Sequence, residues 1–468
     1  MDDIIALCKR RGFIYPSSEI YGGFSGVYDY GHYGTLLKNN IQDAWWKEMV
    51  LYRKDVIGLD SGIFMHPTTW KASGHVDSFS DPQIDCKNCK NRMRADHYLE
   101  KFGHDVDRVP LTKVNKILDE LRKQKKLHCD KCGSENLTEA RDFNLLVQTN
   151  FGSPIGKLQN LPDEDVVYPR GETCQGIYLN YKNVIDSMRI KPPFGIAQVG
   201  KAFRNEIVVK QFIFRTREFE QMEMQYFLHP NDMDQKFEYW KEERMNWYLK
   251  VLQIPQEKLR FKKHEKLVHY AKAAYDIQYR FNCFDKYDEI EGIHQRGDWD
   301  LNRHGQFSGQ KLDYLNPVTK ERFIPHIMET SVGLNRLVLM VLDMAYTKED
   351  LGDGKSRVIL KLPTGIAPVK VAIFPLQKDE KLRKLAEDLY VNMRKLFVTE
   401  FDDAGNIGKM YRRQDEIGTP FCVTVDYQSL EDRMVTVRER DSMKQERIKI
   451  EELGEYFDAW KIAGEILV

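Results

Sequence analysis

The sequence reads QVGKAFRNE over residues 198–206 and FRTREFEQME over residues 214–223, and these two segments are its most informative feature. Apolar residues recur among the charges, so each segment predicts a strand and the pair predicts an antiparallel hairpin. The period of two groups polar side chains on one face of each strand: Gln198, Arg204 and Glu206 on the first, Arg217, Gln221 and Glu223 on the second. Charges on a half-buried sheet are usually paired or used for a ligand. The alternative is an edge hairpin with surface ion pairs.

A second segment, ETSVGLNRLVLMVL over residues 329–342, has the pattern of a strand end that runs into an apolar helix. Together the segments resemble motifs 2 and 3 of class II aminoacyl-tRNA synthetases, Phe-Arg-x-Glu at 203–206 and Gly-Leu-x-Arg at 333–336. The sequence segments around these motifs are similar to those of the glycyl-tRNA synthetase family. The resemblance runs nearly end to end, because it also covers Gly12–Trp46, Arg170–Tyr181 and Tyr411–Asp426. Each motif alone is moderately specific, and five in order are highly specific.

The length of 468 residues exceeds what one core supports and predicts two or three domains. The resemblance implies an α+β fold. It places a class II catalytic domain, an antiparallel sheet with flanking helices, at 1–81 and 137–361, an insertion at 82–136, and an anticodon-binding domain at 362–468. Alternating strand and helix patterns after Pro368 predict a small α/β sheet in the last domain. Within it, Gly408–Pro420 resembles the anticodon-binding domain shared by the glycine, histidine, proline and threonine synthetases.

The N-terminal region predicts an amphipathic helix around Gly34–Leu51 and then a strand toward Pro67. This order resembles motif 1, which forms the dimer interface in the class, so the resemblance implies a homodimer. The glycines of Tyr21–Gly26 precede the helix. A phosphate-binding loop is an alternative for them, but no strand precedes them and no Gly-Lys-Ser/Thr ending follows. We interpret them as turns.

The charge balance is even, because lysine plus arginine and aspartate plus glutamate both number 71. A tRNA partner must therefore be argued from local sites rather than from a global basic excess. The run Arg122–Lys126 is either a solvated helix face or a contact to a tRNA backbone. The first residues have no apolar core of signal-peptide length, and no run approaches about 18 apolar residues. We expect a soluble, cytoplasmic protein that does not bind membranes.

Four of the eight cysteines form two Cys-x-x-Cys pairs, Cys86/Cys89 and Cys129/Cys132. In a reducing cytosol this spacing favours a metal over disulfides, and the polar flanks suit a closed tetrahedral zinc site with four thiolate ligands. Unliganded cysteines are the alternative. Because residues 90–128 separate the pairs, more than the roughly 15–20 residues of a compact ribbon, a helix is expected between them at Thr112–Lys126.

The reaction that the resemblance implies has two steps: glycine and ATP give glycyl-adenylate and pyrophosphate, and the terminal adenosine of tRNA then accepts the glycyl group. Both steps need positioning and neutralisation of phosphate charge, which arginines and magnesium supply. The predicted catalytic residues are Arg204 at the α-phosphate, Glu206 at the adenine amino group and Arg336 at the γ-phosphate. The predicted ATP-binding residues are Arg204, Asn205, Glu206, Phe214, Arg215, Arg217, Glu218, Phe219, Glu289, Ile290, Gly333 and Arg336.

Glu289 lies where the family places an acidic residue near ATP and magnesium. One carboxylate suffices, because Mg²⁺ keeps several waters and also uses the substrate phosphates. The sequence leaves open whether Glu289 or Glu291 binds the ion, and whether both are merely exposed acids.

Glycine offers only an ammonium and a carboxylate to hold, so larger amino acids must be excluded by volume. The resemblance implies an acidic pocket, with these predicted glycine-binding residues: Arg94, Glu172, Phe219, Gln221, Glu223, Glu329, Ser331 and Gly333. Cys174 stands where the family often has alanine, and because both residues are small we expect the pocket to survive. If Arg94 is part of the site, the insertion reaches over it.

Two other functions are compatible with parts of this pattern. One is a synthetase-like binding protein that keeps the fold without catalysis, but such relatives lose the motif arginines and the acidic residues that are present here. The other is a class II synthetase for proline, threonine, histidine or serine. The set Glu172, Glu223, Glu329 and Ser331 separates that alternative, because a larger substrate would not need it.

Overall fold

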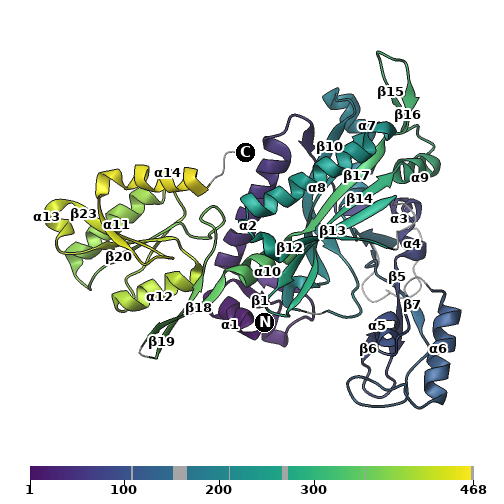
Figure 1. Cartoon of the computed structure of the whole chain (residues 1–468), viewed down its shortest axis with the longest axis horizontal. Coiled ribbons are helices and arrows are strands. Elements are labelled where there is room, and N and C mark those ends of the chain that lie inside the picture. The colour runs from purple at the N-terminus through teal and green to yellow at the C-terminus, as the bar shows by residue number, and fades with distance from the viewer. Residues whose placement is uncertain (107–108, 151–165, 210, 266–271, 353, 465–468) are drawn as a thin grey trace.

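The computed structural model describes the chain except residues 107–108, 151–165, 210, 266–271, 353 and 465–468. Figure 1 shows a broad central sheet with its helices, a small module at one end of it, and a C-terminal α/β domain on the opposite side. Among the described residues, no helix is long and apolar enough to cross a membrane.

A seven-stranded sheet forms the centre, in the order β12-β13-β14-β17-β11-β10-β3. Neighbouring strands run antiparallel except β3, which runs parallel to β10. The strands are β3 (Val56–Gly58), β10 (Phe194–Phe203), β11 (Glu218–Leu228), β12 (Leu259–Lys263), β13 (Ala273–Phe281), β14 (Lys286–Gly297) and β17 (His326–Gly333).

The predicted hairpin consists of β10 and β11, and it lies inside this sheet. Gln198 pairs with Glu223 across the hairpin, and on the other side of β11 Glu223 pairs with Ser331 of β17. The edge-hairpin alternative is wrong, because β11 has a strand on each side and β3 covers part of β10. The motif 2 and motif 3 segments are thus neighbours in one sheet.

The two faces of the sheet are covered differently. One face carries α8 (Met233–Lys250) and α10 (Leu334–Ala345), with α2 (His32–Trp46, continued by a π-helical turn to Leu51) against α10. This face buries the main apolar core, to which the strands contribute Met222, Met224, Ile293, Met328 and Val332. The other face packs on α7 (Cys174–Met188) and α9 (Trp299–Ser308) at one end of the strands.

Two expectations for the N-terminal region are refined by the structure. The glycines of Tyr21–Gly26 do form turns, with positive φ at Gly22, Gly23 and Gly26. A short strand does precede them, contrary to expectation, since they lie between β1 (Ile14–Pro16) and β2 (Tyr28–Tyr30). The strand expected to end at Pro67 is only β4 (Phe64–Met65). Pro67 instead begins α3 (Pro67–Ala72), because its fixed φ and missing N–H suit the first turn of a helix.

The insertion has a sheet and a core of its own. Its strands are β5 (Ser80–Asp85), β6 (Arg92–Arg94) and β7 (Arg141–Asn144), and its helices are α5 (Ala95–Glu100) and α6 (Leu111–Lys123), the helix expected near Thr112–Lys126. The core includes Ile84, Leu99, Val114, Leu118 and Leu137. The sequence predicts that the strands of the catalytic domain resume near Asp142. The strand there is β7, which belongs to the sheet of the insertion because it pairs with β5.

The C-terminal domain is a five-stranded sheet in the order β21-β20-β22-β23-β24, which confirms the predicted α/β alternation. Its elements are β20 (Val371–Pro375), α11 (Glu380–Met393), β21 (Thr399–Phe401), α12 (Ile407–Ile417), β22 (Phe421–Val425), α13 (Ser429–Asp432), β23 (Met434–Glu439), β24 (Gln445–Lys449) and α14 (Leu453–Gly464). Pro363, Gly365 and Pro368 predict a loop over Lys355–Pro368 before this domain. The loop is shorter than predicted, because Lys355–Leu360 is β19, paired with β18 (Tyr346–Gly352).

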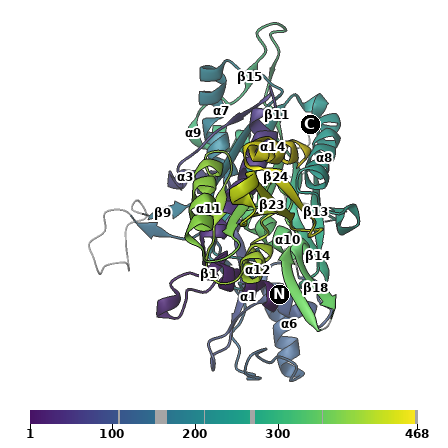
Figure 2. The same ribbon diagram turned by 90° about the vertical axis from the view of Figure 1, so that its left-hand side faces the viewer.

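The first two helices touch the C-terminal domain, which Figure 2 shows in front of the central sheet. Arg11 of α1 (Asp2–Arg11) donates to the Glu416 carboxylate of α12 at 2.5 Å. From α2, Asn40 Nδ2 donates to the carbonyl of Ala367 at 3.0 Å, and Lys38 Nζ binds Glu220 of β11 at 2.6 Å. Helix α2 therefore contacts both the central sheet and the entry to the C-terminal domain.

Candidate active site

A cavity of about 320 Å³ lies on the face of the sheet opposite α8 and α10. Strand alternation explains which side chains reach it, since residues two apart point to the same face. Most of the predicted site residues line it: Arg94, Glu172, Arg204, Glu206, Phe214, Arg215, Phe219, Gln221, Glu223, Glu289, Glu329, Ser331, Gly333 and Arg336. Motifs that are far apart in the sequence thus meet in one place.

A β-bulge in β14 separates Glu289 from Glu291. The pairing with β13 shifts between Ile277 and Gln278, so that Ile290 is the extra residue and the two glutamates point to opposite faces. Glu289 lines the cavity, with Oε2 at 3.2 Å from Arg336 Nη1. Glu291 is fully buried on the helix side. There its carboxylate binds Arg244 of α8 at 2.7 Å and accepts the Tyr248 hydroxyl at 2.8 Å.

Three carboxylates meet in the cavity, and each is held by polar partners. Glu172 Oε1 accepts Gln175 Nε2 at 2.9 Å and lies 3.4 Å from His75 Nε2. Glu223 accepts the Thr173 hydroxyl and Gln225 Nε2. Glu329 contacts three groups: His294 Nδ1 at 2.8 Å, Gln225 Nε2 at 2.9 Å and Arg296 Nη1 at 3.0 Å.

The three carboxylates differ in charge. Burial, together with the nearby carboxylates of Glu329 and Glu172, raises the pKa of Glu223 to about 8. Burial also disfavours ionised Glu329, but Arg296 and His294 prevail and lower its pKa to about 2. Glu172 is likewise buried, and His75 and Arg296 hold its pKa well below the ordinary range. Near neutral pH the surroundings therefore favour the ionised form of Glu172 and Glu329 and the protonated form of Glu223.

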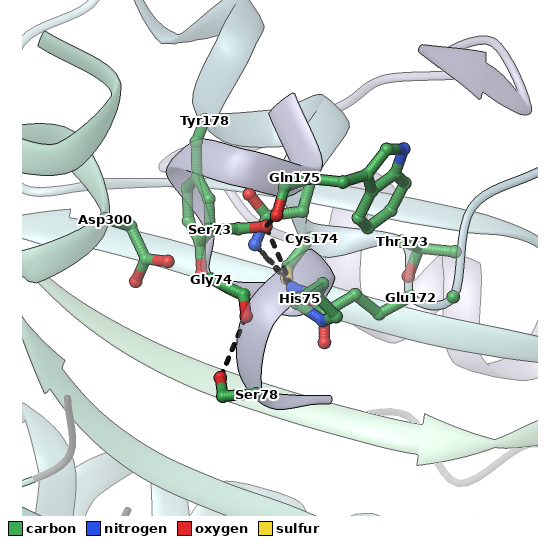
Figure 3. A network of polar contacts seen from close by, with 12 residues as sticks. Ser73, Gly74, His75, Ser78, Glu172, Thr173, Cys174, Gln175, Tyr178 and Asp300 are labelled. Carbon is green, nitrogen blue, oxygen red and sulfur yellow. Dashed lines mark hydrogen bonds and ion pairs between the residues drawn. The ribbon is translucent and has the colours of Figure 1, made fainter. Parts of the chain in front are cut away.

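Cys174 lies behind the acidic end of the cavity, with its sulfur within 4.8 Å of carboxylate oxygens of Glu223 and Glu329. It is buried at the start of α7, and its thiol donates to Glu172 Oε1 at 2.9 Å, beside His75 as Figure 3 shows. His75 belongs to α4 (His75–Ser78), and its ring stacks edge-on against Trp70 at 5.3 Å between centroids. A small residue at 174 is therefore compatible with the pocket.

Two arginines supply positive charge near aromatic rings. Arg204 Nε donates to the carbonyl of Gly171 at 3.0 Å, and its guanidinium lies 5.1 Å from the ring of Phe79 and 5.4 Å from that of Phe219. Arg336, in the first turn of α10, lies 4.6 Å from the Phe214 ring centroid. A guanidinium fixed in this way stays charged and can bind phosphate through two parallel hydrogen bonds.

The insertion reaches the cavity, as Arg94 implied. Arg94 Nη1 lies 2.7 Å from Asp81 Oδ2, and its Nη2 lies 2.5 Å from Asp96 Oδ2. Burial and the nearby carboxylates of Asp96 and Glu206 raise the pKa of Asp81 to about 6, although Arg94 opposes them. One wall of the cavity thus comes from the small module.

Sequence comparisons identify relatives for both large domains. The class II core domain of tRNA synthetases (G, H, P, S and T) matches residues 159–345, and an anticodon-binding domain matches residues 370–460. The glycine–tRNA ligase of Borrelia garinii subsp. bavariensis is 50% identical over 97% of this chain and 96% of its own length. The chain belongs to the glycine–tRNA ligase family. The ligase of Thermobifida fusca is 46% identical over 99% of this chain and 98% of that relative.

A solved structure of the same class has the same fold. The prolyl-tRNA synthetase of Cryptosporidium parvum, crystallised with L-proline and AMP, matches 98% of this chain and 74% of its own with a TM-score of 0.63 at 15% identity. The predicted fold class, a class II synthetase core with an anticodon-binding domain, is confirmed.

Four predicted residues of this synthetase are not brought to the cavity. Ile290 belongs to the main core, because it follows Glu289 in β14 and alternation turns it to the opposite face. Glu218 forms an ion pair with Lys201, and the backbone N–H of Asn205 donates to Leu145. Arg217 donates to the carbonyls of Ser25 and Glu206, so it shapes the loop beside the cavity instead of lining it.

Several cavity residues were missed from the sequence. Arg296 is buried, binds Asp300 through two hydrogen bonds of 2.8 and 2.9 Å, and contacts Glu329. His294, Asp81 and Asn335 also line the cavity. The signal was present for Arg296 and His294, which follow Gly292 at intervals of two, so that regular alternation places them on the same face as Gly292.

The four paired cysteines of this synthetase meet in the insertion. Their sulfur atoms all lie within 4.8 Å of one another, with Cys86 Sγ 3.7 Å from Cys132 Sγ and Cys89 Sγ 3.6 Å from Cys129 Sγ. Four thiolates at about 2.3 Å from a tetrahedral zinc ion lie about 3.8 Å apart, so the donor set fits zinc.

Proposed function

We propose that this chain attaches glycine to tRNA(Gly) in two steps, through an enzyme-bound glycyl-adenylate made from glycine and ATP. The observation that carries this proposal is the acidic pocket. Glu172, Glu223 and Glu329 converge beside the small residues Ser331 and Gly333, in the same cavity as Arg204 and Arg336. Such a pocket suits the ammonium of the smallest amino acid next to a triphosphate. The match to glycine–tRNA ligases over nearly the whole chain supports the same substrates.

In the first step, a glycine carboxylate oxygen attacks the α-phosphorus of ATP. The bond from that phosphorus to the bridging oxygen breaks, and pyrophosphate leaves with the electron pair. Arg204 holds the α-phosphate, Arg336 holds the γ-phosphate, and Phe214 with Glu206 receives the adenine. These groups align the attack and offset charge that develops on the phosphate oxygens. In the second step a hydroxyl of the terminal adenosine of tRNA takes the glycyl group and AMP leaves.

Glycine selectivity follows from charge and volume. When glycine binds, Glu223 loses its proton and the glycine ammonium takes the place of that proton among the three carboxylates. The attraction of the carboxylates then offsets the cost of burying the ammonium. Cys174, Thr173 and Gln221 fill the surrounding volume, with Gln221 Nε2 donating to Ser331 Oγ at 3.3 Å. A side chain on the amino acid would have to displace these packed groups, which is penalised steeply.

Two metal ions complete the proposal. Glu289 suits Mg²⁺, since it lines the cavity, whereas Glu291 is saturated by Arg244 and Tyr248. Magnesium would neutralise phosphate charge there. Cys86, Cys89, Cys129 and Cys132 suit a structural zinc ion that holds the module carrying Arg94. We further propose a cytoplasmic homodimer whose C-terminal domain binds the anticodon.

The test is exchange of labelled pyrophosphate into ATP by the purified chain with each of the twenty amino acids. Exchange with glycine alone is the expected result. Exchange with proline, threonine, histidine or serine would refute the pocket assignment while keeping the class. ATP binding without exchange for any amino acid would favour a non-catalytic binding protein.

A further inference from the structure

Two histidines and an aspartate meet next to the cavity on its β13 side. His264 follows β12, Asp276 lies in β13 and His294 in β14, and one ligand atom from each falls within 4.8 Å of the other two. His264 Nε2 lies 2.8 Å from Asp276 Oδ1, and the rings of His264 and His294 are 6.0 Å apart, edge to face. Of these three, only His294 lines the cavity. The reaction described above uses neither His264 nor Asp276.

The hydrogen bonding of this cluster is incomplete. His264 Nε2 is buried, and although Asp276 is close, the ring N–H is not aligned to donate to it or to any other described residue. A buried, unsatisfied ring nitrogen costs free energy unless it has another partner. A bound cation would supply that partner, because a neutral imidazole nitrogen and a carboxylate oxygen both have lone pairs to donate.

A second carboxylate orients His294. Its Nδ1 lies 2.8 Å from Glu329 Oε1, and a neutral ring that donates its Nδ1 proton to this carboxylate would present Nε2 as the acceptor. This carboxylate–histidine arrangement is the one that fixes the ring of a metal-binding histidine. Gly292 makes room for the ring, since a Cβ at that position would lie 3.2 Å from His294 Nε2.

The spacing also fits a metal ion. Ligand atoms at about 2.0–2.1 Å from a tetrahedral ion lie about 3.4 Å apart, so the 2.8 Å approach of His264 and Asp276 needs to open by about 0.6 Å. The His264 side chain is 36% exposed, so this ligand of the cluster is reached by solvent.

We propose that His264, Asp276 and His294 bind a divalent transition-metal ion of the zinc type, at a site separate from the four cysteines and from Glu289. Two imidazoles and one carboxylate are donors that suit Zn²⁺, Co²⁺ or Ni²⁺, whereas Mg²⁺ prefers oxygen ligands. The ion would stiffen the His294–Glu329 pair and so connect metal occupancy to the acidic pocket. Glu289 and Arg296 are the other charged groups that act on His294, and neither is needed as a ligand.

The experiment titrates Zn²⁺ into the full purified chain, with total zinc measured by mass spectrometry and free zinc by a fluorescent indicator. The wild type is expected to bind a second equivalent beyond the one held by the four cysteines, in the presence of excess Mg²⁺. His264→Ala and Asp276→Asn are each expected to weaken that second equivalent by about 100-fold or more, since loss of a direct ligand exceeds the 10–100-fold of an outer partner.

His229→Ala is the matched control, because His229 is also paired with a carboxylate, Glu321 at 3.1 Å, but has no second histidine in that pair. It is expected to keep both equivalents. Circular dichroism checks that each variant is folded, and two ligand variants are made so that one that misfolds does not end the test. The proposal is overturned if the wild type binds one equivalent only, or if the second survives both ligand variants. Zinc content is read without glycine activation, so the result is independent of the proposed reaction.

Discussion

Glu289 and Glu291 lie two positions apart in β14, and replacing each by glutamine should have opposite consequences. Glu291→Gln leaves the Arg244 guanidinium buried, with 1% of its side chain exposed, without a charged partner. Breaking a buried pair in this way costs about 3–5 kcal/mol. Glu289 is 45% exposed and its pair with Arg336 is solvated, so Glu289→Gln should cost at most about 1 kcal/mol in the free energy of unfolding.

Activity should follow the reverse order. Glu289→Gln removes the carboxylate proposed for Mg²⁺ and for orienting Arg336, and by analogy with loss of one charge-stabilising group it should lower kcat by about 10²–10³-fold. Glu291→Gln should keep most of its activity below its unfolding transition, because its carboxylate faces α8 and not the cavity.

Urea unfolding followed by tryptophan fluorescence, with glycine-dependent pyrophosphate exchange at low temperature, measures both quantities on the same samples. Equal destabilisation by the two variants would show that the bulge does not separate the side chains. Full exchange activity in Glu289→Gln would remove its role at the phosphates.

Three further predictions concern the cavity and the insertion. Arg204→Ala should keep the fold and lower kcat/KM for adenylation by about 10²–10³-fold, read by pyrophosphate exchange; unchanged exchange would contradict its placement. The pKa of Glu223 is raised to about 8, so between about pH 4.5 and 8 the empty folded state binds more protons than the unfolded state. The contribution of Glu223 to the free energy of unfolding is therefore lost as pH rises through that window. Over the same window glycine should bind more tightly with rising pH in calorimetry, with proton release, and Glu223→Gln should flatten that pH dependence. Removing zinc with a chelator, or replacing Cys129 by serine, should make residues 87–131 sensitive to limited proteolysis. Either change should also weaken ATP binding, because the module that carries Arg94 loses its support. Resistance to cleavage together with an unchanged KM for ATP would argue that zinc has no structural role.

The sequence predicted the fold and most of the cavity because motif residues lie on regular strands. Residues such as Glu223, Ser331 and Gly333 could be placed on a face by counting in twos, and the structure puts them there. The two-residue alternation of side chains breaks down at the β-bulge in β14. Strict alternation would place Glu289 and Glu291 together, and only the extra residue Ile290 separates them.

Long-range packing explains the other differences. Arg217 and Glu218 are as polar as Arg204, yet one supports the loop at Ser25 and the other pairs with Lys201, contacts that no local pattern encodes. Arg296 was missed because its strand carries several charged residues, and no local pattern shows that Asp300 and Glu329 lie around this one. The acidic pocket also depends on that arginine for its charge distribution.

Helix α2 sets the distance between the central sheet and the C-terminal domain. Lys38 binds Glu220 of the central sheet, and Asn40 donates to the carbonyl of Ala367 at the entry to the C-terminal domain. Less than one helical turn separates these two contacts, so the helix holds the catalytic strands and the C-terminal domain at a fixed separation. The linker that follows Leu360 therefore does not set the domain spacing alone. Extra residues in that linker would lengthen the loop without moving the domains. One residue inserted between positions 38 and 40 would rotate one of the two contacts by about 100° about the helix axis relative to the other, so that both could not form together.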